Sequence, residues 1–124
     1  MGKRSRRRER APDAPAPLPD APTADYPGAG GQVLTLRCVL TLKTRAQYAD
    51  VLHGNTLSQE DAWHRAVEFL FERLAVRWEI SGVVTAGQKD LLLRLRAATV
   101  EERGFVRGAL REHCAEWFPD VEAP

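Results

Sequence analysis

From Val33 to Lys43 every second side chain is a leucine or a cysteine, and the positions between them are mostly polar. This alternation predicts a long β-strand with one buried face. One strand cannot satisfy its own backbone hydrogen-bonding groups, so a partner strand is required. The best partner is residues 76–84, where Val76, Trp78 and Ile80 alternate with charged residues. Two strands form a marginal sheet, so either a helix layer covers the leucines or a second subunit completes the sheet.

Side chains that can cap helix N-termini indicate where helices begin. Thr44, Thr85 and Thr99 each stand three residues before a Gln or Glu, which is the capping-box spacing, and Ser58 stands three residues before Asp61. An alternative for the second strand is that its first half prolongs the preceding helix. The predicted helices lie near residues 45–53, 59–75, 86–97 and 100–117.

This order of elements predicts a small single α+β domain with a long N-terminal strand, a second short strand and about four helices, preceded by a disordered arm. The distribution of proline sets the limits of the domain, because six of the eight prolines lie between Pro12 and Pro27 and none lies from Gly28 to Phe118. Residues 1–32 have few apolar side chains to offset the entropy of ordering. We expect a disordered arm at residues 1–32, basic and then rich in Pro and Ala, the globular domain at 33–118 and a C-terminal tail at 119–124.

The net charge of +1 conceals a basic N-terminus. Residues 1–10 carry six basic side chains against Glu9, a net +5, whereas residues 11–32 carry −3 and residues 33–124 carry 12 basic against 13 acidic side chains, a net −1. Such an arm can contact the phosphates of a nucleic acid or serve as a solubilising tail. The candidate contacts in the arm are Lys3, Arg4, Arg6, Arg7, Arg8 and Arg10.

Three arginines, Arg103, Arg107 and Arg111, form a row along the last predicted helix at a spacing of four residues. No acidic residue stands three or four positions from any of them, so the helix does not neutralise its own row. The row needs solvent, an anionic or nucleic-acid ligand, or acidic partners elsewhere. The polar side of the second predicted helix supplies candidate partners, namely Asp61, His64, Glu68 and Glu72.

Four further positions suggest packing. Phe69 lies away from the apolar side of the second helix and is expected to contact either a neighbouring element or a subunit or partner interface. Gly104 and Gly108 each cost about 1 kcal/mol relative to Ala inside a helix, so they predict a close approach by another helix or a phosphate backbone. His113 lies on the apolar side of the last helix and is expected to be buried and hydrogen-bonded.

Recognised patterns for catalysis and metal binding are missing from the sequence. Cys38 and Cys114 have no CxxC or CxxH spacing, and both lie within apolar patterns that are typical of buried thiols. The sequence contains no phosphate-binding loop, GxSxG or HExxH motif. We therefore predict no catalytic residues, no metal site and no cofactor.

These features favour a small non-enzymatic interaction or regulatory protein that acts as a homo-oligomer or binds a protein partner. No apolar segment follows the basic start and no stretch is long enough for a membrane span, which predicts a cytoplasmic protein without membrane contact. One alternative is a nucleic-acid-associated protein that uses the arm and the arginine row. The other is an accessory subunit or small-molecule-binding protein, if the polar side of the second helix opens into a pocket.

Overall fold

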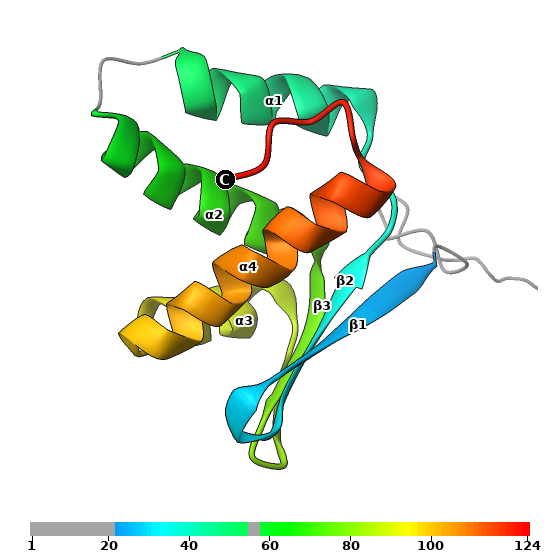
Figure 1. Cartoon of the computed structure of the whole chain (residues 1–124), viewed down its shortest axis with the longest axis vertical. Helices are drawn as coiled ribbons and strands as arrows, with labels where there is room; N and C mark the ends of the chain where they lie inside the picture. Colours follow the sequence, from blue (N-terminus) through cyan, green and yellow to red (C-terminus); the bar gives the residue numbers. More distant parts are fainter. Residues whose placement is uncertain (1–21, 55–57) are drawn as a thin grey trace, which may run out of the picture.

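The computed structural model describes residues 22–54 and 58–124. The elements are β1 (Thr23–Gly28), the 3-10 turn η2 (Ala29–Gly31), β2 (Gln32–Arg37), α1 (Leu42–His53), α2 (Gln59–Leu74), β3 (Ala75–Ile80), β4 (Val83–Ala86), α3 (Gln88–Arg96) and α4 (Val100–Trp117). The strands form one antiparallel sheet in the order β1-β2-β3-β4. The helices gather on one side of this sheet (Figure 1), which confirms the predicted α+β class.

The main core lies between the sheet and the helices. Tyr26, Leu34 and Trp78 are register partners in β1, β2 and β3, so they share one face of the sheet, and all three are buried. Trp78 meets Phe71 of α2 edge to face, with ring centroids 5.7 Å apart. Tyr26 contacts His113 of α4 in the same way at 5.3 Å. These contacts show that α2 and α4 cover the same face, which the leucines of β2 help to form.

The predicted strand from 33 to 43 is only half right, because β2 ends before the alternation does. The chain turns into α1, whose N-cap is Thr41 rather than the predicted Thr44, and the Thr41 hydroxyl accepts a hydrogen bond from the Thr44 N–H at 3.1 Å. Cys38 and Leu40 remain buried in the connecting segment. The alternation therefore marks inward-facing side chains beyond the end of the hydrogen-bonded strand.

The predicted second strand, residues 76–84, is two strands joined by a tight turn. Ser81 and Gly82 have positive φ angles of 51° and 84°, which suit a two-residue hairpin turn. Because this hairpin includes Thr85 in β4, α3 begins later than predicted, after Gly87 with φ of 92°. The alternative, in which the second helix continues through this region, is wrong.

The two remaining helix starts are confirmed. The Ser58 hydroxyl accepts the Asp61 N–H at 3.2 Å and caps α2. Thr99 and Glu102 form a complete capping box at α4, since each side chain accepts a backbone N–H of the other residue, at 3.1 and 3.0 Å. The acidic residues in the first turns of both helices also suit the positive end of the helix dipole.

The predicted boundary of the arm at residue 32 is wrong. Residues 1–21 lie outside the described part of the chain, but β1 pairs with β2 along its whole length. Pro27 is tolerated there because β1 is an edge strand, where a missing N–H need not break the ladder. Gly30 and Gly31, with φ of 72° and 71°, form the tight connection between these strands.

Residues 119–124 are part of the domain and not a loose tail. The Tyr48 hydroxyl of α1 donates a hydrogen bond to the Glu122 carbonyl at 2.6 Å, and Arg111 of α4 donates to the Pro124 carbonyl at 2.9 Å. Pro124 is itself buried. The segment, red in Figure 1, returns from the end of α4 alongside α1 and ties these two helices together.

Candidate functional site

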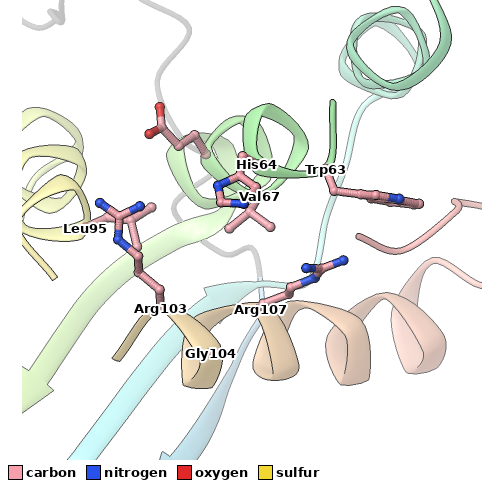
Figure 2. A pocket seen from close by; sticks show the side chains of 8 residues that line it. Trp63, His64, Val67, Leu95, Arg103, Gly104 and Arg107 are labelled. Atoms are coloured by element: carbon pink, nitrogen blue, oxygen red, sulfur yellow. The ribbon is translucent and has the colours of Figure 1, made fainter. Parts of the chain in front are cut away.

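A pocket of about 170 Å³ opens between α2, α3 and α4. Side chains at a spacing of four residues share one side of a helix, so each long helix contributes a pair or more to the walls. The apolar and polar lining residues are intermingled (Figure 2). They are Trp63, His64, Val67 and Glu68 of α2, Leu95 of α3, and Arg103, Gly104 and Arg107 of α4.

Arg103 and Arg107 bring two positive charges to this pocket. The Arg103 guanidinium donates to the Arg96 carbonyl at 2.9 Å, and the guanidinium carbon of Arg107 lies 5.9 Å from the centre of the Trp63 ring. Among the described residues, no carboxylate pairs with either arginine. A guanidinium has five N–H donors, so these single contacts leave donors for a further acceptor.

The acidic side chains of α2 have other partners. Glu68 accepts a hydrogen bond from Arg96 at 3.1 Å, and the Glu72 carboxylate lies 3.4 Å from the Arg73 guanidinium. The Asp61 carboxylate accepts a hydrogen bond from the hydroxyl of Ser58, the N-cap residue of α2, at 3.1 Å. These acidic side chains therefore do not neutralise the arginine row, contrary to one interpretation of the sequence. His64 lies 3.0 Å from Glu60, on the rim of the pocket.

The predicted row of three arginines divides between two places. Arg111 does not line the pocket, because its guanidinium reaches the C-terminal segment at Pro124. The continuous path for a phosphate backbone that the spacing suggested is therefore interrupted along α4. The predicted contacts in the arm all lie outside the described residues, namely Lys3, Arg4, Arg6, Arg7, Arg8 and Arg10.

The three predicted interface residues differ in their surroundings. Phe69 lies 6.2 Å from the Tyr48 ring of α1, with the Arg73 guanidinium 4.7 Å from its ring centre, so packing within the chain accounts for it. Gly104 and Gly108 behave otherwise, because a Cβ atom at either position would meet nothing within 4 Å. The close approach that these glycines predict is not made by any described part of this chain.

His113 is buried and hydrogen-bonded, as predicted. Its Nε2 lies 2.7 Å from the Arg37 carbonyl, which can only accept, so Nε2 donates and Nδ1 accepts from the Tyr26 hydroxyl at 2.6 Å. Burial lowers the pKa of His113 and raises the pKa of Tyr26 to about 12. This pair connects β1, β2 and α4 and lies apart from the pocket.

The two cysteines are buried, and burial raises the pKa of Cys38 and raises that of Cys114 to about 11. Both are therefore neutral thiols near pH 7. In residues 22–54 and 58–124, no cluster of three or more His, Cys, Asp or Glu side chains could hold a metal ion. No helix in that part of the chain is long and apolar enough to span a membrane.

Comparisons of the chain with protein-family models, with curated proteins and with solved structures find no match. The basis for a functional assignment is therefore the geometry of the molecule itself. The pocket between α2, α3 and α4 is where charged groups without carboxylate partners and an aromatic ring meet, and it is the main candidate.

Proposed function

We propose that this protein binds a small ligand that carries an anionic group, such as a carboxylate or a phosphate, beside an apolar or aromatic part. The observation that carries this proposal is the pair Arg103 and Arg107, which line a pocket without a carboxylate partner among the described residues. Arginine suits such a role because its planar fork of donors matches the oxygens of carboxylates and phosphates.

Three of the other lining residues support the apolar part of the ligand, and the Glu68 carboxylate, which also lines the pocket, accepts a hydrogen bond from Arg96. Trp63, Val67 and Leu95 form apolar walls beside the two guanidinium groups. Figure 2 shows Arg107 extending toward Trp63, while Arg103 extends toward Leu95, so the two charges lie at separate places along the pocket. Sites for drug-sized ligands are typically about 300–1,000 Å³, so a volume of about 170 Å³ suits a compact ligand or one end of a longer one.

Replacing Arg107 with glutamine should weaken the binding of phenyl phosphate or benzoate at least about tenfold, because a hydrogen bond to a charged group contributes about 1.5–3 kcal/mol. The measurement is a titration of the full chain followed by the NMR signal of the Trp63 indole. Arg111→Gln is the matched control, since it removes the same charge from the same helix outside the pocket.

The neutral analogue benzyl alcohol tests whether charge matters, and it should bind more weakly than either anion. Inorganic phosphate tests whether the apolar part matters, and it should bind more weakly than phenyl phosphate. Absence of saturable shifts at Trp63, or equal losses for the Arg107 and Arg111 variants, would show that the pocket does not bind such ligands.

We also propose, as a second function, that the protein self-associates through the edge of its sheet at β4. Val83 and Val84 are 69% and 47% exposed, and Leu93 of the adjoining α3 is 55% exposed. In a hairpin with a two-residue turn, the pair next to the turn is hydrogen-bonded, so the backbone groups of Val84 point outward. The other edge, β1, contains Pro27, and a proline protects an edge from pairing.

The full chain should have twice its monomer mass of 13.8 kDa in light scattering at tens of micromolar, and Val84→Lys should return it to the monomer mass. A lysine on this edge opposes strand pairing and adds like charges across a two-fold axis. Val100→Lys is the control, because Val100 is 87% exposed at the start of α4. A monomer at these concentrations, or a dimer that survives the Val84 variant, would count against pairing through β4.

A further inference from the structure

A second concave surface, the β1–α4 groove, lies between the edge strand β1 and the outer side of α4. Its volume is about 620 Å³. Asp25 and Tyr26 lie on the β1 side, and Gly104, Gly108, Glu112 and Glu116 lie on the α4 side. Gly104 and Gly108, which no described part of the chain approaches closely, both line this groove.

The groove is acidic. Glu112 and Glu116 make no ion pair with a described residue. The Asp25 side chain alternates with that of Tyr26 and points to the other face of the sheet, where its carboxylate accepts a hydrogen bond from the Thr35 hydroxyl at 2.7 Å. Among residues 22–54 and 58–124, no lysine or arginine lines the groove. The negative charge of Glu116 adds to the rise in the pKa of Tyr26 that burial causes, so Glu116 acts on the β1 wall across the groove. Two carboxylates with no ion-pair partner among the described residues favour a positively charged occupant.

Gly104 and Gly108 expose the backbone of α4 on the side that faces the groove. They stand one helical turn apart, and the space above both is open. Without Cβ atoms at these positions, an extended chain can approach the helix more closely than it could over larger side chains. Such a contact would account for two glycines that each destabilise a helix by about 1 kcal/mol.

We propose that the β1–α4 groove binds the basic segment at residues 1–10 of the same chain. That segment has a net charge of +5, with six basic side chains against Glu9, which complements the Glu112 and Glu116 carboxylates of the groove. Unlike a separate basic peptide, the segment at residues 1–10 is connected by the chain to the N-terminus of β1, which forms one wall of the groove. Tethering raises its effective concentration at the groove above that of a free peptide.

The geometry of the connection allows this contact. Thr23 at the start of β1 pairs with Arg37, whose carbonyl accepts from His113, so the chain enters β1 beside the half of α4 that carries Glu112 and Glu116. The intervening residues 11–22 can span about 40 Å when extended. This distance exceeds the length of α4, about 27 Å, so the basic segment can reach every part of the groove.

Paramagnetic relaxation in the full chain tests the proposal. A spin label on Ser5→Cys should broaden the amide signals of Gly104, Gly108 and Glu112, and high salt should remove the effect because it screens surface charges. Cys38 and Cys114 are buried, which directs the label to the new cysteine. The double variant Glu112→Gln/Glu116→Gln should reduce the relaxation effect about fivefold, as expected from the loss of two surface charge pairs.

Glu60→Gln/Glu101→Gln is the matched control, because it removes two charges from positions that do not line the groove. This control should leave the broadening unchanged. Equal losses in the two double variants, or no broadening at all, would overturn the proposal. A mixture of spin-labelled chain with unlabelled, isotope-enriched chain should show no broadening, and broadening in that mixture would assign the contact to a second copy and overturn binding within one chain.

Discussion

Replacing His113 with alanine is expected to lower the free energy of unfolding by about 4 kcal/mol. The imidazole is fully buried, and it hydrogen-bonds to the Tyr26 hydroxyl and the Arg37 carbonyl. The alanine variant loses these bonds and leaves the buried Tyr26 hydroxyl and the half-buried Arg37 carbonyl without this partner. It also leaves a cavity beside Phe118, whose ring centre lies 5.5 Å from that of His113. Urea unfolding followed by circular dichroism measures the loss.

His64→Ala is the matched control, since His64 is exposed and pairs with Glu60 on the surface of α2. It should change the free energy of unfolding by less than about 1 kcal/mol. Comparable losses in the two variants would contradict the structural role of the buried imidazole.

The stabilisation by His113 should depend on pH. Burial holds the pKa of His113 below its ordinary value of 6.5, so the unfolded chain takes up this proton at a higher pH than the folded chain does. The stabilisation by the neutral imidazole is complete above pH 6.5 and is lost as the pH falls toward the lower pKa of the folded state. The difference in stability between the parent chain and His113→Ala should therefore shrink with acidification. A difference that stays constant from neutral pH to pH 4 would contradict the lowered pKa.

Replacing Trp78 with alanine should lower the free energy of unfolding by about 3–5 kcal/mol. Its ring is fully buried against Phe71, and the Arg94 guanidinium carbon lies 5.3 Å from the ring centre. Its indole N–H donates to the Gln32 side chain at 3.3 Å. Truncation would leave a large cavity between the sheet and α2 and an unsatisfied amide oxygen. Urea unfolding again provides the measurement.

Trp117→Ala is the control for Trp78, because it removes the same side chain from a position that is 40% exposed. We expect a loss of about 2 kcal/mol, smaller than the loss at Trp78. If the two tryptophan variants were equally stable, the packing of α2 against β3 would have to differ from that described above.

Local hydrogen bonds made parts of this fold predictable. Ser58 and Thr99 cap their helices as predicted because each bond joins residues only three positions apart. The end of β2 depends in part on pairing with the distant strand β3, so the start of α1 at Thr41 was missed. The start of α3 after Gly87 was missed because the turn at Ser81 and Gly82, which makes Thr85 part of β4, was not recognised. Strand β1 was missed because its composition is that of a linker and its order comes from pairing with β2.

The candidate site was predictable only in part. The spacing of charges on one helix showed that Arg103 and Arg107 lacked nearby acidic partners, and these two arginines do line the pocket. Trp63, Val67 and Leu95 were missed as pocket walls. Apolar side chains recur along a helix with the same spacing whether they face a filled core or a pocket. Whether a pocket forms depends on the distance between helices that are far apart in the sequence.

The sheet consists of two hairpins, β1–β2 and β3–β4, which meet along the β2–β3 seam. Each hairpin closes over a short loop, whereas the pairing of Leu36 with Ala75 must wait until α1 and α2 have folded back between them. Hairpins and helices form in microseconds, and contacts between distant residues form more slowly. We therefore infer that the two hairpins and the helices form first and that pairing of β2 with β3 limits the folding rate.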